Sequence, residues 1–268
     1  MSLILPFRDR QEAGEMLAQS LMAEVQAFIG QTGSSSVDST ELTCGSMADW
    51  AIVYALPRGG LPVAEPIARQ LGCPLDILVA KKITYPESPE FAVGAVTASG
   101  QILWLSRDRL KAVSYLNDRD LESQHVALNQ AQDKALAQFS EIHQACPWIT
   151  NYATAPLFLR GKIAILVDDG IATGMTMAVA AQALKQQQPI QVWCCAPVGP
   201  VGLEDSLQDC CDRLIVLEKP DPFMSVSRFY RKFPQVSMEE VIACLHRNHT
   251  LLTDCSDGAV LTKTAEQC

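Results

Sequence analysis

The fold of this chain is decided by the stretch Val167-Asp168-Asp169-Gly170-Ile171-Ala172-Thr173-Gly174. It follows an apolar run at 163–167, which has the length of a buried strand, and it leads into a segment with helical spacing at 174–186. A strand, a short loop and a helix form the repeating unit of open parallel sheets, which bind ligands at such loops. The stretch therefore predicts an α/β fold with a ligand site at 168–174.

The rest of the chain alternates in the same way. Apolar runs predict further buried strands at 51–56, 75–79, 190–196 and 214–217. Apolar residues at helical spacing predict helices at 8–28, 61–71, 114–143 and 201–208. Two runs at 91–96 and 101–105, separated by Thr-Ala-Ser-Gly, predict a hairpin. We expect a mostly parallel twisted sheet flanked by helices, with a β-hairpin beside it.

Composition narrows the classes of function. Among 268 residues, 48% are hydrophobic and 19% charged, as in a soluble globular protein, and no apolar run reaches the roughly 20 residues of a membrane span. The net charge of -9 argues against nucleic acid and anionic membrane as partners. The ten Cys residues lack zinc-knuckle spacing and are expected to be reduced and buried. We expect a cytoplasmic protein that binds small molecules.

The loop at 168–174 has the residues of a phosphate site. Gly170, Ala172 and Gly174 let backbone N–H groups approach an anion closely, Thr173 and Thr176 add hydroxyl groups, and the following helix points its positive end there. The neighbouring carboxylates of Asp168 and Asp169 would repel a phosphate. They must face another part of the ligand, such as a sugar diol or a divalent cation.

An apolar strand, two acidic residues and a Gly/Thr loop entering a helix resemble the phosphoribosyl pyrophosphate signature of type I phosphoribosyltransferases. The resemblance extends from about Phe7 to Val241. It implies that Asp168 and Asp169 hold the ribose hydroxyls and a Mg²⁺ ion. The 5-phosphate would then be cradled by Gly170, Ile171, Ala172, Thr173 and Gly174, together with Thr176.

Two upstream motifs support the resemblance. Pro57-Arg58-Gly59-Gly60 closes a strand and opens a helix, and it resembles the family's pyrophosphate loop. Lys81-Lys82 leads through a Pro-rich turn into a hairpin, which resembles the flexible catalytic loop of a bacterial group of phosphoribosyltransferases with no assigned acceptor. Arg58 and Lys82 would stabilise the departing pyrophosphate, so the implied catalytic set is Asp168, Asp169, Lys82 and Arg58. Taken alone, these motifs would be a turn with an exposed Arg and a solvated strand end.

Residues 218–241 and the N-terminal segment are expected to form a small hood over the acceptor. Phe223 in this hood is the candidate to stack on a planar base, although packing of a small subdomain explains it equally well. Residues 1–245, including a Ser/Gly-rich loop at 30–47, are interpreted as the phosphoribosyltransferase domain, and 246–268 as a polar, flexible tail. A homodimer is expected by analogy with the family.

The resemblance implies a transfer of ribose 5-phosphate from phosphoribosyl pyrophosphate to a nitrogen acceptor, a nucleobase, with release of pyrophosphate. Two departures from the family pattern matter. The stretch 152–156 lacks an expected basic segment, and Ser227 replaces a usual Gly. A non-catalytic regulator that binds phosphoribosyl pyrophosphate or a nucleotide is therefore an alternative. A ribose-phosphate pyrophosphokinase would show two related halves, and an amidophosphoribosyltransferase would need an N-terminal Cys. No general base is identified.

Overall fold

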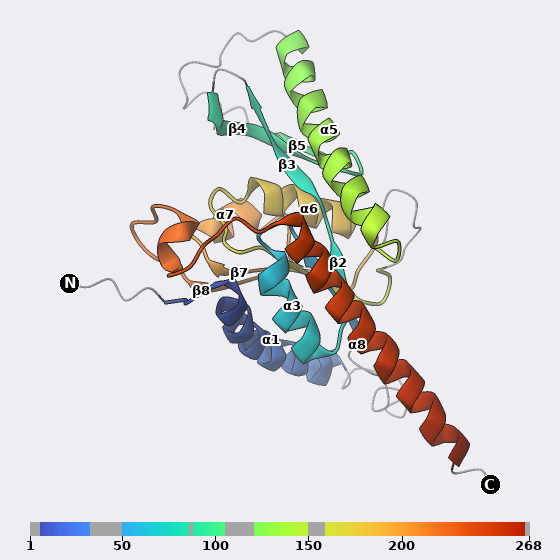
Figure 1. Ribbon diagram of the computed structural model, residues 1–268. Coiled ribbons are helices and arrows are strands. Elements are labelled where there is room, and N and C mark those ends of the chain that lie inside the picture. The colour runs from blue at the N-terminus through green and yellow to red at the C-terminus, as the bar shows by residue number, and fades with distance from the viewer. Residues whose placement is uncertain (1–5, 33–49, 86–87, 105–120, 150–158, 266–268) are drawn as a thin grey trace.

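A five-stranded parallel sheet forms the centre of the protein (Figure 1). The computed structural model describes residues 6–32, 50–85, 88–104, 121–149 and 159–265. The strands lie in the order β2 (Leu75–Ile77), β1 (Ala51–Ala55), β6 (Ile163–Val167), β7 (Gln191–Val198) and β8 (Arg213–Glu218). This confirms the α/β fold class that the alternating segments predict.

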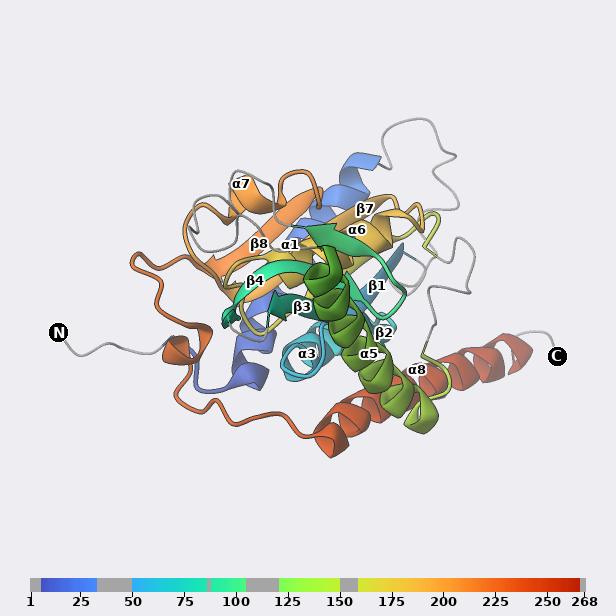
Figure 2. The same ribbon diagram turned by 90° about the horizontal axis from the view of Figure 1, so that it is seen from above.

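Helices cover both faces of this sheet (Figure 2). Strands β1 and β6 are buried along their whole length, and successive side chains enter opposite cores. Val53 and Ile165 pack with α1 (Arg10–Thr32), α3 (Leu61–Leu71) and the start of α8 (Met238–Ala265). Ile52 and Leu166 pack with α6 (Met175–Lys185) and α7 (Leu203–Leu207). Burial on both faces explains why these strands read as continuous apolar runs.

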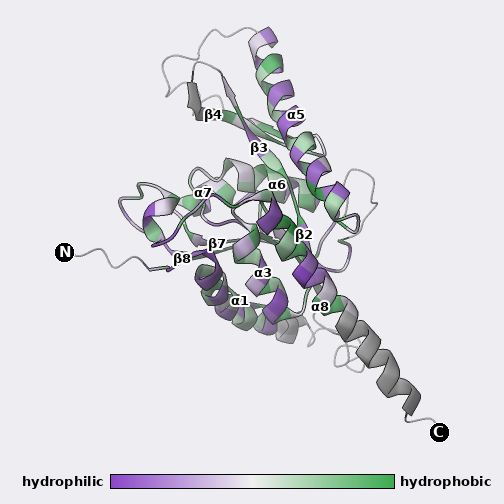
Figure 3. Cartoon of the chain, viewed as in Figure 1, coloured by the Kyte–Doolittle hydropathy of each residue, from purple (hydrophilic) through white to green (hydrophobic). Residues whose placement is uncertain are grey.

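A second, antiparallel sheet stands at one end of the molecule (Figure 1). It contains β3 (Ala80–Tyr85), β4 (Ser88–Thr97) and β5 (Ile102–Trp104). The pairing of β4 with β5 confirms the predicted hairpin, whereas Lys81 and Lys82 lie in β3, a regular strand of the same sheet. Helix α5 (Leu121–Ala145) packs on this sheet and carries hydrophilic and hydrophobic residues along its length (Figure 3). The predicted start of this helix at 114 lies outside the described residues.

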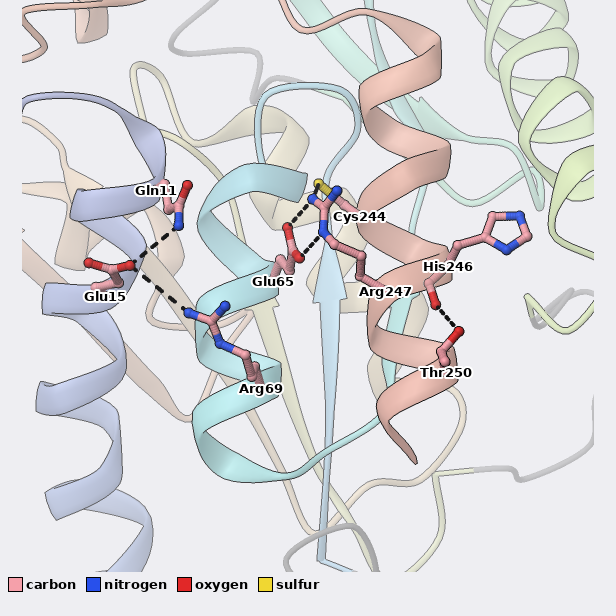
Figure 4. A network of polar contacts seen from close by, with 8 residues as sticks. All are labelled: Gln11, Glu15, Glu65, Arg69, Cys244, His246, Arg247 and Thr250. Carbon is pink, nitrogen blue, oxygen red and sulfur yellow. Dashed lines mark hydrogen bonds and ion pairs between the residues drawn. The ribbon is translucent and has the colours of Figure 1, made fainter. Parts of the chain in front are cut away.

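Helix α8 lies against α3 and differs from the tail that composition predicts. Glu65 accepts two hydrogen bonds from Arg247, at 2.6 Å each, and Cys244 lies beside them (Figure 4). Asn248 is buried and accepts a hydrogen bond from the backbone N–H of Leu75 at 2.9 Å. The chain is therefore helical and packed beyond position 246, and the helix continues to 265. Within the described residues, no helix is long and apolar enough to cross a membrane.

The expected hood has a physical counterpart at the edge of the main sheet. Phe7, at the N-terminus, forms a parallel bridge with Tyr230, which follows the 3-10 helix η1 (Val226–Phe229). The N–H of Phe7 donates to the carbonyl oxygen of Phe229 at 3.2 Å, and the N–H of Arg231 donates to that of Phe7 at 2.9 Å. We use the word hood below for residues 6–9 and 218–236. These hydrogen bonds join the two segments of the hood, and the hydroxyl group of Tyr230 donates to the carbonyl oxygen of Asp169 at 2.6 Å, so the hood lies beside the loop that follows β6.

Candidate functional site

The candidate site lies at the carboxyl ends of β1 and β6. These strands are neighbours, but the chain continues from β1 to β2 on one side and from β6 to β7 on the other. Such a change of direction opens a crevice between the two loops, where open α/β sheets bind ligands. The N–H of Leu56 donates to the carbonyl oxygen of Val167 at 2.9 Å, so both loops leave the sheet side by side. The sequence motifs at 57–60 and 168–174 therefore meet.

Two glycines allow this close approach. A Cβ atom on Gly59 would lie 2.2 Å from Oδ2 of Asp169, far inside van der Waals contact. A Cβ atom on Gly60 would lie 2.6 Å from the carbonyl oxygen of Leu56 and 2.7 Å from that of Val167. The peptide bond between Pro57 and Arg58 is cis. At position 60 a side chain would collide with backbone atoms, and at position 59 it would displace the carboxylate of Asp169, so the two glycines let the loops approach closely.

A cavity of about 270 Å³ opens between the loops. It is lined by Arg10, Leu56, Pro57, Arg58, Gly59, Ala80, Asp168, Asp169, Thr176, Gln235 and Val236. Two guanidinium groups and two carboxylates thus face one space, beside the first turn of α6. Such a cavity can bind phosphates and a sugar diol at the same time.

The acidic pair is held in place by hydrogen bonds. Oδ1 of Asp168 accepts the backbone N–H of Asp169 at 2.8 Å, and Oδ2 of Asp169 accepts Nε of Arg10 at 2.7 Å. Burial raises the pKa of Asp168, and the neighbouring charge of Asp169 raises it further. Burial also raises the pKa of Asp169, although Arg10 counteracts this effect. A cation or a hydroxyl donor in the cavity would relieve this repulsion.

Residues 170–174 divide into buried anchors and exposed groups. Gly170 lies against Val226 of the hood, where a Cβ atom would come within 2.4 Å of the Val226 side chain. Ile171 is buried, and its N–H donates to the carbonyl oxygen of Val198 at 2.9 Å, so this N–H is already used. Ala172 and Thr173 are exposed. Gly174 has a positive φ of 76° and caps α6. Exposed groups of this loop and Thr176 in the cavity wall are the ones that can reach a phosphate.

The two lysines of β3 have different surroundings. Lys82 is exposed, and its positive charge lowers the pKa of Asp168. Lys81 is half-buried; burial lowers its pKa, and the charges of Arg58 and Lys134 lower it further. Neither lysine lines the cavity itself, but both place positive charge near it.

The cavity wall contains residues to which the sequence assigns no role, and it does not contain Phe223. Arg10, Gln235 and Val236 line the cavity; the sequence places them in the span of the family resemblance and in the N-terminal and 218–241 segments of the expected hood, but it assigns none of them a role in the site. Phe223 lies outside the cavity wall and stacks on Phe229, with ring centres 6.0 Å apart and planes 6° apart. Its expected stacking on a base stays a prediction. The packing of this hood cluster, which also includes Phe7 and Tyr230, is the alternative that the sequence left open.

The donor set is compatible with a hard divalent cation. Asp168 and Asp169 offer carboxylate oxygens, the ligand type that Mg²⁺ prefers. In the part of the chain that the structure describes, no three His, Cys, Asp or Glu side chains gather around one point. Asp168 and Asp169 are the residues that would hold a Mg²⁺ ion here.

Comparisons with known proteins show which family this chain resembles. The sequence model of the phosphoribosyl transferase domain matches residues 48–223, more than half of the chain. A Mycobacterium tuberculosis H37Rv protein named "Putative phosphoribosyl transferase" is 32% identical over 246 residues, which are 91% of this chain and 47% of that protein. The chain thus spans about half the length of the curated relatives it matches. The crystal structure of TT1426 from Thermus thermophilus is 28% identical, has a TM-score of 0.62, and aligns over 89% of this chain and 97% of its own.

Proposed function

The chain belongs to the phosphoribosyl transferase domain family, and from this premise we propose that it transfers ribose 5-phosphate from phosphoribosyl pyrophosphate to a nitrogen acceptor. The acceptor that we propose is a nucleobase, and pyrophosphate is the product. The observation that carries this proposal is the meeting of two loops in one cavity: Arg58 on one side, Asp168 and Asp169 on the other.

The reaction needs little from the protein beyond position and charge. The bond between carbon 1 of the ribose and the pyrophosphate oxygen breaks, and a bond from carbon 1 to the acceptor nitrogen forms. Positive charge develops on the sugar and negative charge on the leaving group. Asp168 and Asp169 would orient the sugar through its hydroxyls, and Arg58 with Lys82 would stabilise the pyrophosphate. When bound, Mg²⁺ would neutralise charge on the pyrophosphate.

The 5-phosphate would lie at the start of α6. Gly174 caps this eleven-residue helix, and Thr176 in its first turn lines the cavity. The free N–H groups at a helix start and the helix dipole favour an anion there. In this arrangement the two ends of phosphoribosyl pyrophosphate bind to two different loops, while the acidic pair binds the ribose between them.

Pyrophosphate release across a panel of nucleobases, with Mg²⁺ and phosphoribosyl pyrophosphate, tests the proposal. We expect base-dependent release from the unmodified protein and loss of release in Asp169→Asn. Asp209→Asn, a change at an exposed position outside the cavity, is the matched control and should keep activity. Calorimetric titration with phosphoribosyl pyrophosphate and Mg²⁺ measures binding separately. Absence of both binding and release would overturn the proposal.

A non-catalytic regulator is the second candidate function. It is favoured by the stretch Tyr152-Ala153-Thr154-Ala155-Pro156, which carries no basic residue and lies outside the described residues. Binding of phosphoribosyl pyrophosphate without release of pyrophosphate for any base would support this candidate. A homodimer and a cytoplasmic location, both expected from the sequence, stay predictions that ultracentrifugation and cell fractionation can test.

A further inference from the structure

Arg10, the first residue of α1, lies in the cavity wall beside the acidic pair. It is only 8% exposed. Its Nε donates to Oδ2 of Asp169 at 2.7 Å, and its Nη1 donates to the carbonyl oxygen of Pro234 at 2.7 Å. Its guanidinium carbon lies 3.7 Å from the centre of the Phe233 ring. Because a guanidinium is planar and rigid, these three contacts fix both its position and its plane.

We propose that Arg10 is a positioning residue for the ribose: it orients the carboxylate of Asp169 toward the sugar and fixes the adjoining cavity wall. This inference rests on the proposed function, because it takes the ribose of phosphoribosyl pyrophosphate as the ligand of Asp169. It adds to that function a residue 159 positions away in sequence from the acid that it orients.

The hydrogen bonds of the acidic pair support this role. The bond from Arg10 uses Oδ2 of Asp169, and the backbone N–H of Asp169 uses Oδ1 of Asp168. Each of these bonds uses one oxygen of a carboxylate, and the second oxygen of each can accept a hydrogen bond from a ligand. Two neighbouring hydroxyl groups of a ribose need two acceptors at fixed positions. Without Arg10, the Asp169 carboxylate would be free to rotate away from its neighbour.

The hood holds Asp169 at a second point. The hydroxyl group of Tyr230 donates to the backbone carbonyl oxygen of Asp169 at 2.6 Å. Asp169 is therefore bound through its side chain by Arg10 and through its backbone by Tyr230. Arg10 also binds Pro234, and the next two residues, Gln235 and Val236, line the cavity. The side chain of Arg10 thus orients the carboxylate of Asp169 and also binds the segment that forms the adjacent cavity wall.

The nearest competing role is a direct phosphate contact, since Arg10 and Arg58 line the same cavity. The two roles differ in the ligands they affect. A positioning residue for the ribose matters for ligands that contain the sugar. A phosphate contact matters equally for inorganic pyrophosphate, which has no sugar.

Calorimetric titrations with phosphoribosyl pyrophosphate, ribose 5-phosphate and inorganic pyrophosphate, each with Mg²⁺, separate these roles. Arg10→Gln is expected to weaken both sugar ligands by about tenfold to a hundredfold, the effect of losing a hydrogen bond between charged groups. Arg10→Lys should recover part of this loss, because it restores the charge without the planar fork. Arg69→Gln is the matched control: Arg69 is exposed, lies in α3 outside the cavity wall, pairs with Glu15 at 4.0 Å, and its change should leave all three affinities unchanged.

Three results would decide against the inference. Unchanged sugar-ligand affinity in a folded Arg10→Gln variant would overturn it, and so would an equal loss of pyrophosphate affinity. If Arg10→Gln does not fold, Tyr230→Phe carries the test, since it removes one bond to Asp169 and keeps Arg10. Tyr230→Phe should weaken the sugar ligands severalfold and spare pyrophosphate; no change would overturn the inference. Failure of the unmodified protein to bind phosphoribosyl pyrophosphate would instead overturn the proposed function.

Discussion

Gly59→Ala adds one methyl group where the two loops of the site meet. The new Cβ atom would lie 2.2 Å from Oδ2 of Asp169 and 2.7 Å from its Cγ. The backbone cannot easily yield, because the N–H of Leu56 is bonded to the carbonyl oxygen of Val167 and the N–H of Gly60 to that of Leu56. We therefore expect the Asp169 carboxylate to move, and to lose its 2.7 Å bond with Arg10.

The size of this movement sets the size of the effect. Ordinary van der Waals contact begins at 3.4 Å, so Oδ2 must move by about 1.2 Å (3.4 minus 2.2). A misplacement of about 1 Å in a binding site can lower activity about a hundredfold. The lost hydrogen bond between charged groups corresponds to about 1.5–3 kcal/mol. We expect the affinity for phosphoribosyl pyrophosphate to fall by about tenfold to a hundredfold.

Isothermal titration measures this affinity, and urea unfolding shows whether the variant is folded. Gly30→Ala is the control: Gly30 lies in α1 with no atom within 4 Å of the added Cβ. It should keep its affinity and gain up to about 0.5–1 kcal/mol of stability, as expected for Ala in place of Gly in a helix. A folded Gly59→Ala variant with unchanged affinity would refute the steric argument.

Three further changes test charges in and around the site. Burial and the charge of Asp169 raise the pKa of Asp168, so its ionisation destabilises the fold as pH rises above the pKa of the unfolded chain. At pH 8, Asp168→Asn should therefore raise the free energy of unfolding by about 1 kcal/mol, measured in urea. The same change should abolish binding of phosphoribosyl pyrophosphate. Lys134→Gln should raise the pKa of Lys81, which burial, Arg58 and Lys134 lower; NMR of ¹³C-methylated lysines would detect this. Burial raises the pKa of Glu65, but its bonds to Arg247 lower it below the ordinary value of 4.5; the resulting stability is present above that pH and is lost in acid. Arg247→Gln should lower stability at pH 7 by about 1 kcal/mol and flatten its fall below pH 4.5, measured by urea unfolding.

Local sequence patterns predict the main sheet because each strand carries its own signal. Ile163 to Val167 is apolar throughout since both of its faces are buried, and the same holds for Ala51 to Ala55. The family resemblance assigns the glycines at 59 and 60 to a pyrophosphate loop. The structure gives a second reason for them, which is the contact between the loops.

Arg10 could not be found in this way. Its partners Asp169 and Pro234 are 159 and 224 positions away in sequence, so no local periodicity connects them. Arg8-Asp9-Arg10 contains two arginines, and only the structure distinguishes the exposed Arg8 from the buried Arg10. The polar composition of residues 246–268 suggests a flexible tail for a similar reason, whereas the structure has a helix to position 265. Asn248 is a polar residue whose partners, Leu75 at the start of β2 and Cys73 just before it, are 173 and 175 positions away in sequence.

The energetic cost of the buried acidic pair indicates that residues 168–169 form a ligand site and not merely a connection between β6 and α6. Asp168 and Asp169 are adjacent, and burial raises the pKa of both, which disfavours their charged forms. A corner between β6 and α6 needs neither carboxylate, and a neutral pair would be more stable there. Groups with perturbed pKa values in a cavity are typical of functional sites. The arrangement becomes favourable when a ligand supplies hydroxyl donors or a cation, and the Arg10 contact keeps Asp169 oriented for that ligand.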